Sequence, residues 1–275
     1  MSLPLLTGCI SAGANTVVRS SDLRHWWKMN EGSTVTATDY GRDAETDTNA
    51  SLTNVTSSAG GPSAIGTPSY LRFNGTSAYG RALGQDSAGV DTTLGTTLTS
   101  ADLTVCFWFQ NFYTSSPATY KMIFAAVPNS SWTSGLGAYF ITAPSDYWNA
   151  WVAHWNGSSG FYHTGVTADW VNRTESDGGV WAHCAMVLDS TANTLTTYVD
   201  GVLRDSSATT GDPTAQLAGN STAGVYMLFG AAQNSATNGP FAVSYYSNIG
   251  LSDFRIYDVA LSSTEVGEIV SGDWT

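Results

Sequence analysis

Lysine is nearly absent from this sequence. Only Lys28 and Lys121 are lysines among 275 residues, and eight arginines still leave a formal net charge of −12 at pH 7. A protein that binds a phosphate backbone places many lysines and arginines beside the phosphates and releases counterions, which this chain cannot do. Anionic membrane surfaces repel an acidic chain for the same reason. The composition therefore disfavours nucleic acid as a partner and favours a neutral carbohydrate or another protein.

Cysteine is also scarce. Three cysteines cannot all pair within one chain, and the odd count favours folding in a reducing compartment. Cys106 and Cys184 each lie in an apolar, strand-like segment, where a free cysteine behaves as a small buried hydrophobe. Pairing cannot be read from sequence, so a disulfide between Cys106 and Cys184 stays open.

Long apolar runs are missing as well. No stretch approaches the roughly 20 residues that a membrane-spanning helix needs, so we expect no membrane insertion. The first residues lack the basic start and apolar run of a secretion signal. We expect residues 1–22, rich in Ser, Gly, Ala and Asn, to form an arm that docks on a neighbouring subunit or on its own domain. Residues 23–275 are expected to form one domain, a common length for all-β folds.

The residues that are abundant suit β-strands joined by turns. Gly, Ser, Thr and Asn dominate the polar positions, and 42% of the residues are hydrophobic against 12% charged. Strands are predicted at 23–29, 70–73, 103–111, 122–127, 138–143, 149–156, 160–164, 181–189, 194–199, 202–205, 226–231 and 251–257. Residues 156–160, with two glycines and an asparagine, predict a hairpin.

One short helix is predicted near the C terminus. Ser262 and Glu265 have the spacing of a capping box, with Ser262 as N-cap and Glu265 three residues on. Val266, Ile269 and Val270 follow at helical spacing. The sequence therefore predicts an all-β fold, a sandwich of two antiparallel sheets with one short C-terminal helix.

Three phrases stand in a fixed order along the chain. Residues 27–32 read Trp-Lys-Met-Asn-Glu-Gly, residues 181–189 lead through a strand-like segment to Asp200-Gly201, and residues 251–262 close the set. Together they resemble the laminin G-like branch of the concanavalin A-like jelly rolls, a superfamily of lectins, glucanases and adhesive modules. The resemblance extends over residues 23–270 and implies a jelly-roll sandwich.

Catalysis was tested against the chemistry of the glucanases in that superfamily. Glycoside hydrolysis needs two carboxylates about 5 to 10 Å apart, which laminarinase-type relatives supply from a Glu-x-Asp-x-x-Glu strand. The nearest approach in this chain is Glu45-x-Asp47, which lacks the second glutamate. Nucleophile elbows, phosphate loops and zinc spacings are absent too. The chain is predicted not to be an enzyme, and His183 is predicted to be structural, with its ring hydrogen-bonded near a sheet edge.

Aromatic residues gather between positions 139 and 170. Trp and Tyr offer flat apolar surfaces that suit the C–H faces of sugar rings. Trp148, Trp155 and Tyr162 flank turns and are the candidate ligand-binding residues, with burial in the core as the alternative for this group. Trp26 and Trp27 are adjacent in a predicted strand, so one of them must point outward, where it can contact a partner subunit.

The resemblance also implies a calcium site. Laminin G-like relatives often hold one Ca²⁺ through an acidic turn near the start of the domain, and Ca²⁺ takes six to eight oxygen ligands. Asp39 and Asp43 stand in the matching turn, and Asp253 stands at the acidic position of the last strand. The alternative is that these acids are solvated or cap polar turns.

Two functions remain after these exclusions. The first is a non-catalytic structural or adhesive protein on the surface of a virus particle, a bacteriophage in particular, made in the host cytoplasm. It would bind copies of itself or other virion proteins, and host glycans. Laminin G-like jelly rolls are common among phage virion proteins, and the acidic, lysine-poor composition and the N-terminal arm agree with this reading. The alternative is a stand-alone extracellular lectin module, and a glycoside hydrolase comes third for want of paired carboxylates.

Overall fold

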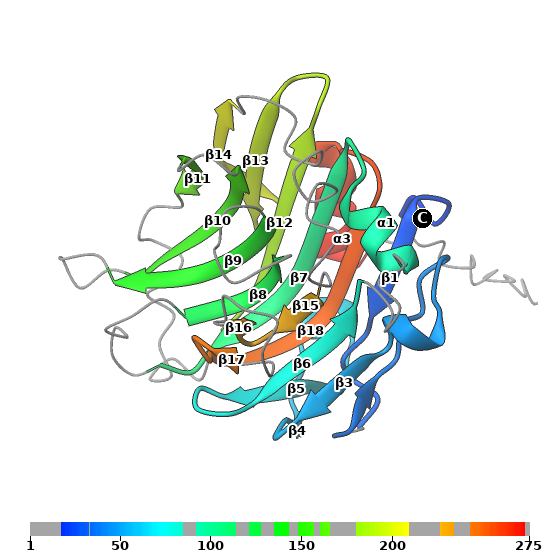
Figure 1. The fold of residues 1–275 in the computed structure, drawn as a ribbon, viewed down its shortest axis with the longest axis vertical. Helices are drawn as coiled ribbons and strands as arrows, with labels where there is room; N and C mark the ends of the chain where they lie inside the picture. The colour runs from blue at the N-terminus through cyan, green and yellow to red at the C-terminus, as the bar shows by residue number, and fades with distance from the viewer. Residues whose placement is uncertain are drawn as a thin grey trace, which may run out of the picture.

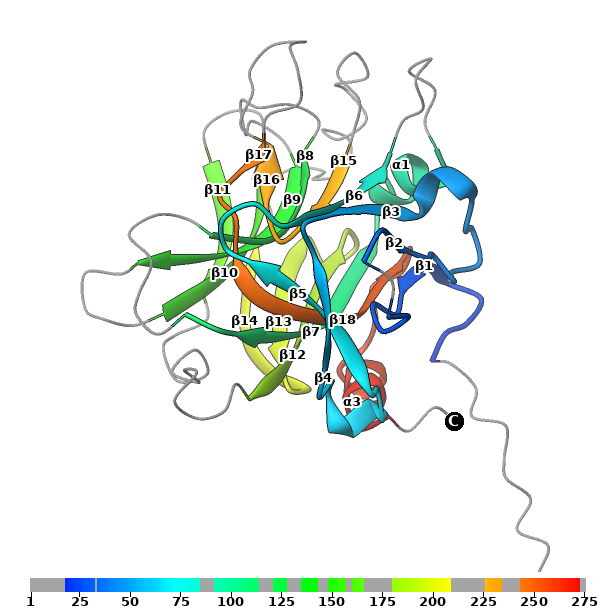
Figure 2. The ribbon, with the colours of Figure 1, turned by 90° about the horizontal axis from the view of Figure 1, so that it is seen from below.

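The computed structural model describes most of the chain in ten segments. These are residues 18–32, 34–84, 92–113, 121–127, 135–142, 148–156, 160–165, 180–208, 226–233 and 243–272. Within them the chain folds into two antiparallel β-sheets packed face to face, as the sequence predicts (Figure 1). The view from below separates the two layers, with β4 and α3 on one side and β3, β6 and β15 on the other (Figure 2).

The first sheet runs in the order β14-β13-β12-β7-β18-β5-β4, and β1 pairs with the second half of β18. Its strands are β1 (Leu23–Trp27), β4 (Thr56–Ala59), β5 (Ser69–Asn74), β7 (Leu103–Asn111), β12 (Trp181–Asp189), β13 (Thr194–Val199), β14 (Val202–Ala208) and β18 (Asn248–Tyr257). The last strand of the chain therefore lies at the centre of the sheet, between β7 and the strands that come early in the sequence.

The second sheet runs in the order β11-β10-β9-β8-β15-β6-β3-β2. Its strands are β2 (Thr36–Ala37), β3 (Ala50–Thr53), β6 (Tyr79–Leu83), β8 (Lys121–Val127), β9 (Gly135–Thr142), β10 (Trp148–Asn156), β11 (Gly160–Gly165) and β15 (Tyr226–Phe229). A separate small ladder joins β16 (Ala232–Gln233) to β17 (Val243–Ser244). The predicted hairpin over residues 149–164 is confirmed as β10 and β11.

Aromatic rings from both sheets fill the space between them. Phe107 of β7 stacks on Phe254 of β18 with ring centres 5.4 Å apart. Trp27 of β1 lies edge-on to Phe229 of β15, on the opposite sheet, at 5.3 Å. All four side chains are fully buried. Because such rings bury large apolar areas, this cluster holds the two sheets together.

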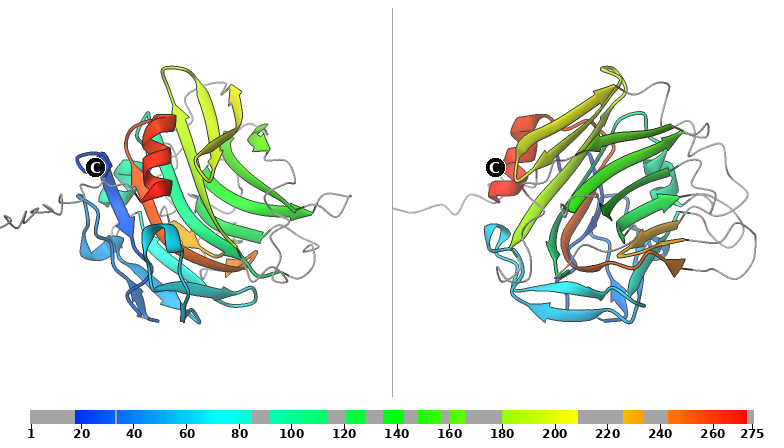
Figure 3. Two further views of the ribbon diagram at one scale, coloured as in Figure 1. Left: turned by 180° about the vertical axis from the view of Figure 1, so that it is seen from behind. Right: turned by 90° about the vertical axis from the view of Figure 1, so that its left-hand side faces the viewer.

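The outer face of the first sheet has a second apolar cluster, under the C-terminal helix α3 (Ser263–Ser271). Val266 and Ile269 of α3 pack in this cluster with Cys106 of β7 and neighbouring side chains, and the views from behind and from the side show α3 against this face (Figure 3). Cys184 of β12 lies instead in the cluster between the sheets. Cys106 and Cys184 are both free, and the sheet itself separates them.

The helices in the described part of the chain are short, and of these only α3 was predicted. α3 has the predicted capping box, because Ser262 accepts a hydrogen bond from the backbone of Glu265, whose side chain accepts one from the Ser262 backbone. The helix α1 (Thr93–Leu98) and the 3₁₀ turns η1 (Thr46–Thr48) and η2 (Ser63–Ile65) were not predicted. None of the helices in the described segments is long and apolar enough to cross a membrane.

The prediction for His183 was wrong in two respects, its position near a sheet edge and its hydrogen bond. Its strand β12 lies inside the sheet, between β7 and β13, so the ring is fully buried rather than near an edge. Neither ring nitrogen has a hydrogen-bond partner within the described residues, and the ring lies edge-on to Trp108 at 5.4 Å. Burial, with a contribution from the positive charge of Arg255, lowers the pKa of His183 to about 3. His183 is therefore a neutral packing residue.

Candidate functional site

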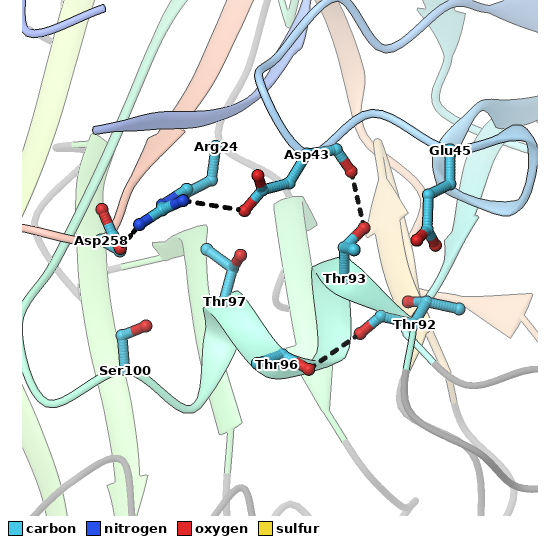
Figure 4. A pocket seen from close by; sticks show the side chains of 9 residues that line it. All are labelled: Arg24, Asp43, Glu45, Thr92, Thr93, Thr96, Thr97, Ser100 and Asp258. Atoms are coloured by element: carbon cyan, nitrogen blue, oxygen red, sulfur yellow. Dashed lines mark hydrogen bonds and ion pairs between the residues drawn. The ribbon is translucent and has the colours of Figure 1, made fainter. Parts of the chain in front are cut away.

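A pocket of about 330 Å³ opens beside β1 (Figure 4). We call it the β1 pocket. It lies where four separate segments meet: β1, the turn after Tyr40, α1 with its flanking residues, and the residue that follows β18. Its lining residues are Arg24, Asp43, Glu45, Thr92, Thr93, Thr96, Thr97, Ser100 and Asp258.

Arg24 is the anchor of the pocket. The β1–β18 ladder shifts register between Leu23 and His25, so Arg24 is the extra residue of a β-bulge. Its guanidinium lies between two carboxylates, with Nη1 3.1 Å from Asp43 Oδ2 and Nη2 2.5 Å from Asp258 Oδ2. The hydrogen bond to Asp258, together with the charges of both acids, raises the pKa of Arg24 despite the opposing effect of burial. The anchor is therefore a fixed cation held on two sides.

The hydroxyl groups of three threonines at the start of α1 already donate hydrogen bonds to backbone carbonyls. The hydroxyl of Thr92 donates to the carbonyl of Leu83 at 2.7 Å, and that of Thr93 donates to the carbonyl of Asp43 at 2.7 Å. The hydroxyl of Thr96 donates to the carbonyl of Thr92 at 3.2 Å. Toward the pocket, these three side chains offer oxygen lone pairs.

Thr97 ends a buried hydrogen-bonded chain, Asp39–His25–Thr97, which we call the relay. Asp39 Oδ2 lies 2.7 Å from His25 Nδ1, and His25 Nε2 lies 3.2 Å from Thr97 Oγ1. A carboxylate only accepts, so Nδ1 carries the shared proton, and in the neutral ring Nε2 accepts from the Thr97 hydroxyl. Asp39 Oδ1 accepts two more bonds, from the backbone N–H groups of Trp26 and Gly41. Burial alone would raise the pKa of Asp39, but His25 and the two N–H groups lower it.

Trp26 lies on β1, two positions beyond Arg24, and shares the ammonium group of Lys28 with Tyr40. Lys28 Nζ lies 4.6 Å from the ring centre of Trp26 and 4.5 Å from that of Tyr40. Tyr40 is 45% exposed, whereas Trp27 is fully buried and Trp26 only partly so. The prediction that one of the two adjacent tryptophans points outward is confirmed, and it is Trp26.

The three acids predicted for calcium all accept hydrogen bonds or ion pairs from protein groups. Asp39 serves the relay, and Asp43 pairs with Arg24. Asp253 accepts from Trp26 Nε1 at 2.7 Å and from Arg255 Nε at 2.9 Å. The described segments contain no group of three or more His, Cys, Asp or Glu side chains that could hold a metal ion. These contacts do not form a calcium cage, and calcium binding stays a prediction.

The aromatic candidates lie at the far edge of the second sheet. Trp148 and Trp155 are in β10, and Tyr162 is in the edge strand β11. The register pairs Trp155 with Phe161 and His154 with Tyr162. The side-chain positions of the three candidates lie outside what the structure describes, so their role in binding stays a prediction.

Reasoning from the sequence missed most of the β1 pocket. Of its lining residues, only Asp43 was a candidate, and it was assigned to a metal rather than to an ion pair. Glu45 was noticed only as part of an incomplete hydrolase motif. A charged residue inside an apolar strand, as Arg24 is, was the one available signal, because buried strands seldom hold an arginine without a partner.

A family model described as the concanavalin A-like lectin/glucanases superfamily matches residues 83–267. Among curated proteins, none matches the sequence. Similar solved structures include the binding domain of botulinum neurotoxin DC in complex with rat synaptotagmin II, with a TM-score of 0.60 and 11% identity over 91% of this chain and 51% of that one. Another is domain 4 of AbnA, an extracellular arabinanase from Geobacillus stearothermophilus, in complex with arabinotriose, with a TM-score of 0.55 and 16% identity over 90% and 98% of the two chains.

A third similar structure is a botulinum neurotoxin type C protein, whose cell entry is described as dependent on interaction with two ganglioside molecules. Its TM-score is 0.60, with 10% identity over 91% of this chain and 51% of that one. The chain thus spans about half the length of these neurotoxin chains. At such identities the likeness is one of fold.

Proposed function

The chain belongs to the concanavalin A-like lectin/glucanases superfamily, in its laminin G-like branch, and from this premise we propose that it is a non-catalytic carbohydrate-binding module. The observation that carries the proposal is the β1 pocket, a polar cavity of about 330 Å³ with a fixed arginine and several oxygen acceptors. Sugar hydroxyls donate to such oxygens, and a few well-placed polar groups are what orient a ligand in a pocket.

Two of the similar structures support the same class of ligand. The arabinanase domain is in complex with arabinotriose, and the type C neurotoxin is described as interacting with gangliosides. The arabinanase domain is matched over 98% of its length, so its saccharide is bound by a fold similar to this one, whereas the neurotoxin chain is matched over 51%. We therefore propose a saccharide as the ligand of this chain, with the aromatic candidates Trp148, Trp155 and Tyr162 as a second contact surface.

The contacts of Arg24 support a binding role over a hydrolytic one. Hydrolysis requires two carboxylates on either side of the scissile bond, with that bond in the space between them. Asp43 and Asp258 flank the pocket, but the guanidinium of Arg24 occupies the space between them and bonds to both. A sugar can therefore lie against this group but not between the two acids.

We propose the surface of a virus particle, a bacteriophage in particular, as the place where the module works, with an extracellular lectin as the alternative. The support is the composition: a net charge of −12 with two lysines disfavours nucleic acid and leaves protein or glycan partners. In this role the chain would assemble with copies of itself or with other virion proteins. Light scattering on the purified chain tests the assembly, and a stable monomer would count against the particle role.

The experiment that tests binding is a panel of oligosaccharides and polysaccharides, run with Ca²⁺ and again with EDTA. We expect saturable binding of at least one glycan, weakened about tenfold or more by Arg24→Ala, because Arg24 holds Asp43 and Asp258 in position. Arg204→Ala is the matched control, because Arg204 is exposed on β14.

Each outcome of the panel has a definite meaning. No binding under either condition would sink the carbohydrate proposal. Binding that Arg24→Ala leaves unchanged would remove the β1 pocket as its site and leave the β10–β11 hairpin. Binding that EDTA abolishes would support the calcium prediction.

A further inference from the structure

The hydrogen-bonding character of the β1 pocket narrows the class of sugar, and this step rests on the carbohydrate-binding function proposed above. We infer that the β1 pocket takes a sugar residue with a free amino group, bound as its ammonium form. The inference depends on which lining groups can still donate a hydrogen bond, and on the charge that they leave.

The lining offers many acceptors and few donors. Four threonine hydroxyls face acceptors of the protein itself: three donate to backbone carbonyls, and that of Thr97 donates to His25 when the ring is neutral. Ionised carboxylates only accept. Apart from Arg24 and Ser100, every lining side chain therefore presents lone pairs to a ligand. A ligand group with several donors and no acceptor complements this lining. An ammonium group has three donors and no acceptor.

The charge of the pocket favours the same group. Asp43, Glu45 and Asp258 bring three negative charges, and the positive charges of Arg24 and of Arg42, whose Nε lies 3.8 Å from Asp43 Oδ1, leave a formal −1. Arg24 bonds to Asp43 and Asp258 and faces both of them, so Glu45 is the acid without an ion pair to it. An ammonium group gains Coulomb energy in such a site, and a uronate or sialate is repelled.

The arrangement is fixed before a ligand arrives. The buried pair of His25 and Asp39 sets the orientation of the Thr97 hydroxyl, and both side chains are fully shielded from solvent. The bond from Thr93 to the Asp43 carbonyl ties α1 to the acidic turn. Because ordering these groups costs nothing at the moment of binding, a small polar ligand can gain measurable affinity.

The test compares oligomers of glucosamine with oligomers of N-acetylglucosamine and of galacturonate of the same length, by titration calorimetry at low salt. We expect the glucosamine oligomer to bind about fivefold or more tighter than the acetylated one, and this preference to shrink as salt screens the charges. The galacturonate oligomer should bind weakest.

A pair of matched variants locates the effect. Glu45→Gln removes one charge from an exposed position of the pocket, and Glu268→Gln removes one charge from α3. We expect Glu45→Gln to reduce the preference for glucosamine about threefold and Glu268→Gln to leave it unchanged. Circular dichroism and the melting temperature check that both variants fold, and Asp258→Asn gives a second reading of the pocket charge.

The outcomes distinguish a failure of this inference from a failure of the proposed carbohydrate-binding function. Equal affinity for the glucosamine and acetylated oligomers would overturn the inference and leave the carbohydrate-binding function standing. No binding of any saccharide would overturn both. If ethanolamine bound as tightly as glucosamine, the pocket would be an ammonium site without sugar recognition, and the inference would be overturned. Equal effects of Glu45→Gln and Glu268→Gln would overturn it as well.

Discussion

Asp39 has a different role in the structure from the one that its sequence suggests. Its place in an acidic turn suggested a metal ligand, whereas its carboxylate collects the His25 ring and two backbone N–H groups. Only 5% of Asp39 is exposed. The sequence could place the acid in the turn, where Gly41 lies two positions away, but the other two partners come from β1, 13 and 14 positions away, and no local pattern indicates them.

Replacement of Asp39 should reveal how much the relay stabilises the fold. Asp39→Ala leaves His25 and two N–H groups buried without their acceptor, and we expect it to cost about 3 kcal/mol in the free energy of unfolding. Because the folded pKa of Asp39 lies below its unfolded value of 3.8, its contribution is present above that value and is lost as pH falls through the folded pKa. Urea unfolding of both proteins at neutral and acidic pH measures the difference.

The control for this comparison is Asp205→Ala, at a strand position where the side chain, among the residues that the structure describes, bonds to the neighbouring backbone, Ser206 N. It should change stability little at either pH. A loss for Asp39→Ala that does not shrink with falling pH would show that packing, rather than the charged hydrogen bonds, explains the effect.

Single elements were predictable where one local signal fixes them. The range predicted for β7 is the range observed, 103–111, and α3 begins where the capping box places its N-cap. α1 was missed because its sequence, Thr-Leu-Gly-Thr-Thr-Leu, has a poor helix propensity. It forms because Leu94 and Leu98 bury fully in the core while Thr92 caps its first turn. Packing, which the sequence does not display, decided that element.

The capping box of α3 is open to a direct test. Ser262→Ala removes the side chain that accepts from the Glu265 backbone, and we expect a loss of about 1 kcal/mol in the free energy of unfolding. Ser263→Ala, one residue into the helix and exposed, is the control and should have almost no effect. Chemical denaturation followed by tryptophan fluorescence gives both values. Equal losses would mean that helix propensity, not capping, was measured.

For the whole molecule, architecture was predictable and the candidate site was not. Alternating apolar residues and the three phrases at positions 27–32, 181–201 and 251–262 are spread along the chain, so they specify the sandwich redundantly. The β1 pocket depends instead on segments far apart in sequence, as the contact between Arg24 and Asp258 illustrates. Such convergence follows from the strand order, which places β1 beside β18. Strand order is a property of the folded chain, and no short motif carries it.

The two free thiols lie on opposite sides of the first sheet, so their reaction rates measure how the molecule opens. Burial raises the pKa of the Cys106 thiol to about 12 and that of Cys184 further still, so neither reacts while its cover is closed. Cys106 becomes reactive when α3 lifts, and Cys184 when the sheets part. Alkylation followed by peptide mass spectrometry should give two separate rates if the helix detaches first. One shared rate would mean that both layers open in a single cooperative event.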